Sequence, residues 1–300
     1  MHYFAYNLRI TSEIPLPELP PSDCGGDVEV RLNPPRELAP ARSISWSSVS
    51  PAESRFCYPG AGRFVIREGR SIEVTPEPNV DLELLRLYVE GMMLAALLDQ
   101  RGYFVLHASI VNIGGYAIGF VGPVGAGKST LAAGFHARGR PVAADDNAAV
   151  DLSGSDPMIL PGFPSVKIYP EIAIALGYSR ESLRSMHSSQ IKQARSVSGG
   201  FAEQPLPLGA IYVLDRDAAA GVCPLSAMEP LVELIRHSVP TRWGVAGDGA
   251  HLHKCSRLSQ SVPLFRLRTF TGLPEIAEVL DRIEDHCSRF AGTMVERAAN

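Results

Sequence analysis

Hydrophobic and polar positions alternate along the first part of the chain in short stretches typical of β-strands. Prolines and glycines separate these stretches, and proline restricts its own backbone and that of the preceding residue. We therefore predict a small β-rich region over residues 1–79, with a proline-rich strap along its surface at residues 15–21. The expected strands are residues 3–10, 27–32, 55–58, 63–68 and 71–74.

From residue 81 onward the apolar spacing changes to that of helices and buried strands. Apolar side chains recur at helical intervals over residues 81–100, and Gly102 closes this helix. Residues 103–111 and 116–121 are expected to pair as a hairpin over Gly114 and Gly115. The mixture of helical and strand patterns predicts an α/β domain over residues 80–300, with a mixed sheet flanked by helices. Further helices are expected at 129–138, 170–176, 230–238 and 274–290, and strands at 141–146, 207–214 and 263–267.

Composition narrows the class of protein. The chain has 300 residues, of which 45% are hydrophobic and 20% charged, as in soluble globular proteins. A net charge of -4 provides no basic surface for nucleic acid, and no apolar run approaches the roughly twenty residues that span a bilayer. The first residues lack the pattern of a secretory signal, and the five cysteines contain no C-x-x-C pair. We expect a cytoplasmic protein with reduced thiols and no membrane insertion.

One stretch carries specific chemistry. Gly122, four further residues and then Gly127-Lys128-Ser129 match the phosphate-binding pattern G-x-x-x-x-G-K-[ST], between a strand-like and a helix-like run. Glycines let backbone amides surround phosphate oxygens, Lys128 neutralises the outer phosphates and Ser129 can ligate magnesium. The predicted nucleotide-binding residues are Gly122, Pro123, Val124, Gly125, Ala126, Gly127, Lys128, Ser129 and Thr130.

Two adjacent acids follow this loop. Asp145 lies 17 positions after Lys128, so one helix and one turn join the loop to the strand that ends in Asp145 and Asp146. We expect that strand to lie beside the strand of the phosphate loop. Near phosphates, one carboxylate can hold magnesium and the other can take a proton from an attacking hydroxyl. The alternative for two adjacent aspartates is a solvated turn.

Two other segments contain candidate ligands. Residues 184–200 are polar, with basic positions at Arg184, Lys192 and Arg195, and suit a mobile loop that closes over a phosphorylated or acidic ligand. Their alternative is an exposed linker. In residues 251–255, alternation would place His251, His253 and Cys255 on one face of a strand, as a zinc site or simply as a polar face.

The order of these motifs resembles the catalytic core of HPr kinase/phosphorylase. The resemblance is carried by Leu106-His107-Ala108-Ser109, by the phosphate loop and by Val142-Ala-Ala-Asp145-Asp146. It implies a P-loop kinase core of the HPr kinase type and an ATP-dependent serine kinase. In such an enzyme Asp145 is the general base, Asp146 supports it, and His107 lies at the active site. Thr130 stands where that family has a glutamate.

The chain also resembles the HPr-kinase-like proteins of bacterial peptide maturation, notably the lasso peptide kinases. Residues 7–19 are similar to their openings, and Gly-Ala-Gly-Lys-Ser-Thr130 is similar to their phosphate loops. This resemblance implies transfer of phosphate from magnesium-ATP to the terminal serine of a precursor peptide, and it leaves a homo-oligomer open. Lys167, Lys192 and Arg195 are similar to the family's downstream basic positions.

Three alternatives stay open at the level of sequence. The first is an HPr-type protein serine kinase/phosphorylase. The second is a transport-type ATPase, suggested by Val197-Ser-Gly-Gly200 and by the apolar strand ending at Asp215. Arg216 then stands where such an ATPase carries the glutamate that activates water. The third is a nucleotide-binding regulator without catalytic activity.

Overall fold

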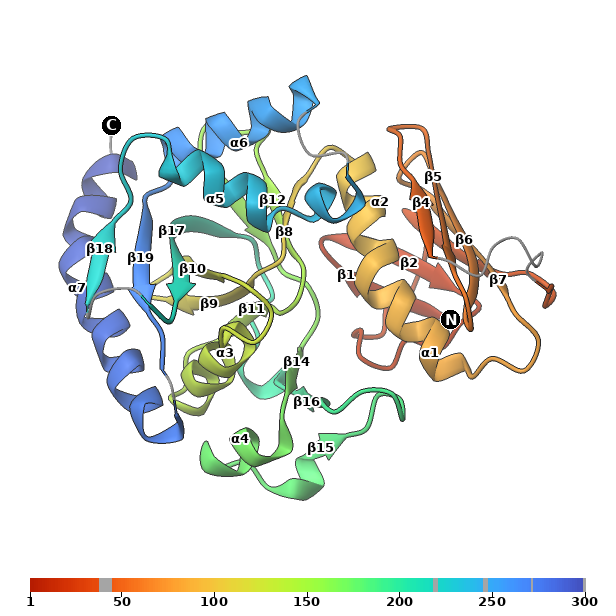
Figure 1. Ribbon diagram of the computed structural model, residues 1–300, viewed down its shortest axis with the longest axis horizontal. Coiled ribbons are helices and arrows are strands. Elements are labelled where there is room, and N and C mark those ends of the chain that lie inside the picture. The colour runs from red at the N-terminus through yellow and green to blue at the C-terminus, as the bar shows by residue number, and fades with distance from the viewer. Residues whose placement is uncertain (38–44, 218–220, 245–247, 271, 299–300) are drawn as a thin grey trace.

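The computed structural model describes residues 1–37, 45–217, 221–244, 248–270 and 272–298, except for the side chains of residues 290–298. Strands of the N-terminal region form one sheet in the order β1-β2-β3-β7-β6-β5-β4 (Figure 1). Residues 3–10, predicted as one strand, form a hairpin because Tyr6 and Asn7 both have positive φ and reverse the chain. The strands are β1 (His2–Ala5), β2 (Leu8–Ser12), β3 (Val28–Leu32), β4 (Trp46–Ser48), β5 (Glu53–Tyr58), β6 (Gly62–Arg67) and β7 (Ser71–Pro76).

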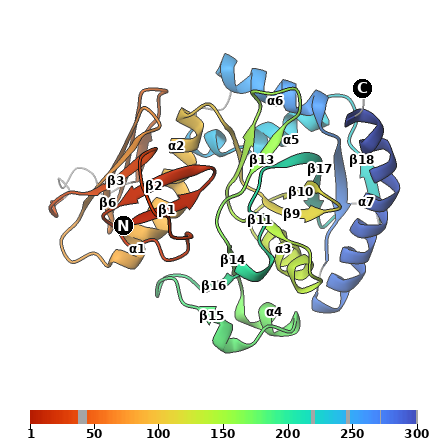
Figure 2. The same ribbon diagram turned by 180° about the vertical axis from the view of Figure 1, so that it is seen from behind.

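The predicted helix over residues 81–100 is present, with an irregular middle. It consists of α1 (Leu82–Tyr88), a π-helical turn η2 (Val89–Met93) and α2 (Leu94–Gln100). The helix lies between the N-terminal sheet and the rest of the molecule (Figure 2). Its apolar residues share one core with the N-terminal strands and with Val105 and Val239. The division at residue 79 stays a prediction, because the two sides have a common core.

The remaining strands form a mixed sheet centred on the parallel pair β10 and β17. From β10 the order continues to β9 and β11, and from β17 it continues both to β19 with β18 and to β13, β12 and β8. These strands are β8 (Phe104–Leu106), β9 (Ser109–Ile113), β10 (Tyr116–Val121), β11 (Val142–Ala144), β12 (Ala148–Asp151), β13 (Met158–Leu160), β17 (Leu206–Asp215), β18 (Val222–Pro224) and β19 (Leu264–Arg268).

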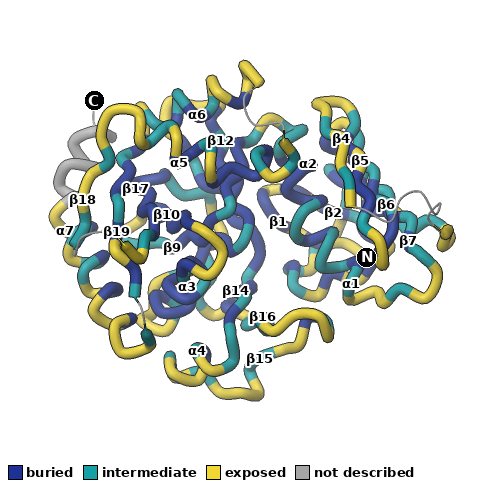
Figure 3. Tube along the Cα trace, viewed as in Figure 1, coloured by how far each residue is buried: buried dark blue, intermediate teal, exposed yellow. Residues whose placement is uncertain are grey.

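Helices cover this sheet on two sides. The helix α3 (Lys128–Ala137) packs with α7 (Ile276–Ala298) against one face, and α5 (Glu229–His237) packs with α6 (Gly249–Ser261) against the other. The strands β10 and β17 and the helix α3 are therefore largely buried (Figure 3). This architecture confirms the predicted fold class as a mixed α/β fold with a mixed sheet flanked by helices.

A third, small sheet lies beside α3. It has the order β14-β16-β15, with α4 (Pro170–Ala175) inserted after its first strand. The segment expected to be a loop over residues 184–200 therefore contributes the last residue of one strand, the whole of a second strand and a 3-10 turn. The elements are β14 (Ser165–Ile168), β15 (Leu183–Arg184), β16 (Gln193–Ser196) and η4 (Ser198–Gly200).

Two further sequence predictions, on the place of β11 and on residues 251–255, are wrong. The strand that ends in the two acids, β11, pairs with β9 and not with β10, because the β9–β10 hairpin occupies the place beside the phosphate-loop strand. Residues 251–255 are helical rather than extended. Asp248 caps this helix by accepting from the His251 amide, and the buried residues His251, Cys255 and Leu258 follow helical spacing.

Within the described residues, no helix combines the length and the apolar character that crossing a membrane requires.

Candidate active site

The phosphate loop connects the buried strand β10 to the first turn of α3. Gly127 caps α3 with a left-handed backbone (φ 104°), and a Cβ there would lie 2.6 Å from the Phe270 ring. Glycine is therefore required on two grounds. No side chain caps the helix among the described residues, so its N-terminal amides remain available for an anion.

Lys128 is folded back onto the loop that carries it. Its Nζ donates to the carbonyl oxygens of Gly122 at 2.9 Å and Pro123 at 3.2 Å. Burial lowers the pKa of Lys128 to about 8, although the charges of Asp145 and Asp146 oppose the shift. The Lys128 ammonium group donates to neutral carbonyl oxygens, and a bound triphosphate would give it an anionic partner.

Asp145 and Asp146 lie where the antiparallel pairing between two neighbouring stretches of the chain is interrupted. Strands β8 and β9 run in one direction and β11 and β12 in the other, with Leu106 opposite Ala148 and Ile110 opposite Ala144. Between these pairs, residues 107–108 face residues 145–147 without strand pairing, and we call these five residues the strand break. Asp146 has φ 76° here. Such irregularities redirect side chains out of a sheet and occur next to active sites.

Asp145 points into the protein and is 7% exposed. Its carboxylate accepts from the Ser109 hydroxyl at 2.5 Å and from the Lys167 amide at 2.9 Å, and the nearby Ser129 of the phosphate loop also favours its ionised form. Burial and the neighbouring charge of Asp146 raise the pKa of Asp145. A carboxylate with a raised pKa beside the phosphate loop is suited to accept a proton.

Asp146 has a different environment. Its Oδ2 accepts from Lys167 Nζ at 2.6 Å, and its Oδ1 lies 3.4 Å from His107 Nδ1. Burial by itself would raise the pKa of Asp146, but Lys167 and His107 outweigh burial and hold that pKa well below its usual range. Asp146 therefore stays ionised at all physiological pH values.

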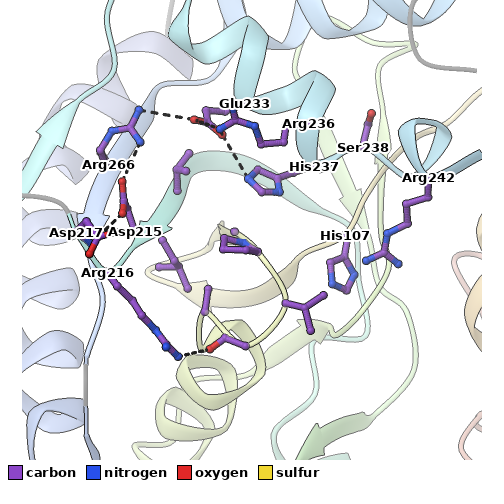
Figure 4. Close-up of a pocket in the computed structure, with 17 residues that line it drawn as sticks. His107, Asp215, Arg216, Asp217, Glu233, Arg236, His237, Ser238, Arg242 and Arg266 are labelled. Atoms are coloured by element: carbon purple, nitrogen blue, oxygen red, sulfur yellow. Dashed lines mark hydrogen bonds and ion pairs between the residues drawn. The ribbon is translucent and has the colours of Figure 1, made fainter. Parts of the chain in front are cut away.

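His107 connects the strand break to an open cavity. Its Nδ1 donates to the Asp146 carbonyl oxygen at 2.9 Å, which leaves Nε2 as the acceptor nitrogen of a neutral ring. Burial lowers the pKa of His107 to about 4, so this neutral form prevails at pH 7. The ring lines a cavity of about 630 Å³ together with the phosphate loop (Figure 4).

Four arginines that were not predicted as site residues also line this cavity, and two of them, Arg216 and Arg242, lie near the phosphate loop and His107. Arg216 donates to the Gly125 carbonyl at 2.8 Å, next to Asp215 at the end of β17. Arg242, in the 3-10 turn η5 (Val239–Trp243), is exposed near His107, and its charge lowers the pKa of Lys128. Within the described residues, the Arg242 guanidinium makes no hydrogen bond or ion pair. No local motif marks either arginine, because only the fold brings η5 to the phosphate loop.

The predicted basic contacts separate into three cases. Lys167 belongs to the site through Asp146. Lys192 lies 5.4 Å from the centre of the Tyr169 ring, yet close enough for its charge to lower the pKa of Lys128. Arg195 is placed elsewhere: its guanidinium lies 4.8 Å from the centre of the Tyr178 ring, and Tyr178 donates to a carbonyl of α3, at Ala133. A closing role for Arg195 over the phosphates is not supported.

The candidate metal sites also differ. Among the described residues, no three His, Cys, Asp or Glu side chains lie together as a metal site. His251 Nε2 contacts Cys255 Sγ at 3.5 Å, whereas His253 is exposed, so the proposed zinc triplet does not assemble. Ser129 and Asp145 do lie together, and a hydroxyl with a carboxylate is the oxygen donor set that magnesium prefers beside nucleotide phosphates.

No family model and no curated protein sequence matches this chain. Its structure is distantly similar to that of the Hpr(Ser) kinase/phosphatase from Coxiella burnetii, with a TM-score of 0.37 and 10% sequence identity. The similarity covers 65% of this chain and 98% of that chain. A likeness this distant carries no functional argument, so the function has to be inferred from the residues themselves.

Proposed function

We propose that this protein is an ATP-dependent kinase that transfers the γ-phosphoryl group to a serine hydroxyl of a peptide or small protein. The observation that carries the proposal is Asp145, a buried carboxylate with a raised pKa that lies close to the phosphate-loop residue Ser129. This arrangement joins a proton acceptor to a phosphate cradle. A protein that only binds nucleotide has no need of the acceptor.

The residues of the loop fit magnesium-ATP. The backbone amides of residues 122–129 and Lys128 would hold the phosphates, while Ser129 and an oxygen of the Asp145–Asp146 pair would complete the environment of the metal. Magnesium supplies neutralisation of phosphate charge when it is bound. Phosphoryl transfer depends mainly on positioning and charge neutralisation, so a lysine, a cation and one carboxylate form a sufficient set.

Asp145 and Asp146 divide the work of the acid pair. Adjacent carboxyls with pKa values shifted in opposite directions are a sign of separate acid–base roles. In the proposed step the serine oxygen attacks the γ-phosphorus, the bond from that phosphorus to the ADP oxygen breaks, and the hydroxyl proton passes to Asp145. Asp146 remains ionised and fixes Lys167 and His107 around the acceptor.

The acceptor is proposed to be the C-terminal serine of a lasso-type precursor peptide. A second cavity, of about 690 Å³, lies between the proline-rich strap and the segment around β14. Its lining includes Ser165, two residues before Lys167, so an extended chain in this cavity can approach the strand break. An HPr-type protein acceptor is the nearest alternative, and a homo-oligomer is compatible with either acceptor.

Incubation with γ-labelled ATP and serine peptides tests the proposal. We expect label in a peptide, and we expect removal of its serine to abolish the transfer. Label found only in free phosphate, with or without a peptide or HPr, would favour the ATPase alternative and overturn the kinase. Asp215 is the acid to examine in that event, because it ends the strand parallel to β10 and faces the same cavity.

A further inference from the structure

A buried pair of glutamates lies behind the proposed catalytic acids. Glu90, in the π-helical turn η2, is 3% exposed, and the side chain of Glu18 in the strap is 7% exposed. The two carboxyl groups lie within hydrogen-bonding distance of each other. Oε1 of Glu90 and Oε2 of Glu18 are nevertheless both buried without a donor among the described residues.

One proton resolves both unsatisfied oxygens. Two ionised carboxylates would repel each other inside the protein, whereas a protonated carboxyl donates to its ionised neighbour. Around the pair, Arg184 and Arg86 approach Glu18, the latter at 3.9 Å, while Lys167 and Tyr6 face Glu90. The two arginines favour the charge on Glu18, so the proton belongs on Glu90. Burial also raises the pKa of Glu90 well above its usual value.

The glutamate pair is connected to the strand break by two contacts. Asn147, directly after Asp146, donates from Nδ2 to the Gly91 carbonyl of the π-helical turn at 2.8 Å. Lys167 binds Asp146 at 2.6 Å, and its charge also acts on Glu90. An ionised Glu90 would therefore compete with Asp146 for Lys167, and a protonated Glu90 would not.

We propose that Glu90 and Glu18 share one proton and act as positioning residues that leave Lys167 to Asp146. The catalytic consequence rests on the proposed kinase function, whereas the shared proton does not. π-Helical turns are frequent at functional sites, and the turn η2 places Glu90 on the side of the helix that faces the strand break.

The shared proton can be tested by thermal unfolding of Glu90→Gln, a neutral isostere of the protonated acid. Above the unfolded-state pKa of about 4.3 the unfolded wild-type chain releases a proton that the folded protein keeps, so wild-type stability falls with pH up to the folded pKa. The difference in Tm, variant minus wild type, should rise between pH 5 and pH 7.5 by about 2–4 °C or more. Glu83, an exposed residue earlier in the same helix, provides the control. For Glu83→Gln the difference in Tm between variant and wild type should not change with pH.

A flat or falling difference for Glu90→Gln would mean that Glu90 is ionised in the folded protein, and it would overturn the proposal. Failure of this variant to fold would do the same, because an amide should replace a neutral acid without unfolding the protein.

Kinetics test the positioning role separately. Glu90→Gln should retain kcat within about twofold, whereas Glu90→Ala should lower kcat about tenfold without changing KM for ATP, because truncation removes the donor to Glu18 and leaves a cavity in the turn that faces Lys167. Equal losses in both variants would overturn the positioning role. A wild-type protein that transfers no phosphate would overturn the kinase and this role together, while the Tm series still decides the shared proton.

Discussion

The phosphate loop and the strand break meet at one site but are built in different ways. The loop is one continuous segment whose function follows from local backbone geometry, as the left-handed Gly127 illustrates. The strand break depends on groups from separate parts of the chain, with Ser109, Lys167 and His107 all acting on two adjacent aspartates. A local motif therefore predicts binding, whereas the properties of the acids are set by the tertiary fold.

The largest effect should come from separating the two acids by mutation. Asp145→Asn removes the proton acceptor, so turnover should fall by about 10²–10⁴-fold while ATP affinity is retained. Asp146→Asn is the matched variant, and asparagine tolerates the left-handed backbone at this position. It should lower Tm by leaving Lys167 without its partner, and it should reduce turnover less than Asp145→Asn. Steady-state kinetics, ATP titration and thermal unfolding measure these effects.

Equal turnover losses in the two variants, with equal ATP affinity, would remove the distinction between base and ion-paired partner. Full activity in Asp145→Asn would falsify the assignment of the base.

A mutation in the phosphate loop should cause a smaller loss of turnover but should also weaken ATP binding. Lys128→Ala removes the ammonium group that stabilises the transferred phosphoryl group, so turnover should fall on the order of 10²–10³-fold. ATP affinity should fall as well, in contrast to Asp145→Asn, because the lysine also contributes to ground-state binding. If titration calorimetry found unchanged ATP affinity, the folded-back Lys128 would have a structural rather than a phosphate-binding role.

The smallest effect is expected from Arg242, whose positive charge lies near both the phosphate loop and the strand break. Arg242→Ala should lower kcat/KM for ATP by about 10–100-fold, because the exposed Arg242 guanidinium lies near His107 at the edge of the cavity and can approach the phosphates. Arg236→Ala is the control, since Arg236 lines the same cavity but is bound to Glu233 at 2.9 and 3.0 Å. Similar losses in both variants would mean that only the net charge of the cavity matters.

Much of the fold follows from local patterns in the sequence. The helix over residues 81–100, the β9–β10 hairpin and the strand β17 were predicted because their apolar spacing is continuous. The strand predicted over residues 251–255 is wrong, since alternation over five residues also fits a helix with buried positions four apart. The placement of β11 beside β9 depends on strand order, which chain proximity alone does not determine.

The candidate site divides in the same way. Lys128, His107 and the two aspartates were found from sequence and do lie together, although their catalytic roles stay predictions. Arg242 and Glu90 were not found, because an exposed arginine and a single acid in an apolar helix are unremarkable until the fold gives them neighbours. Arg195 was predicted as a possible phosphate or substrate contact from its charge and from the family resemblance, and its contact with Tyr178 required the structure.

The most direct test of the central claim is a ¹³C NMR titration of the aspartate carboxyl groups. Asp145→Asn and Asp146→Asn identify the two resonances. We expect Asp145 to titrate above the usual aspartate pKa of about 3.9 and Asp146 to stay ionised below it. The reverse order, or two ordinary values, would contradict the proposal that the strand break makes one acid a base and its neighbour an ion-paired support.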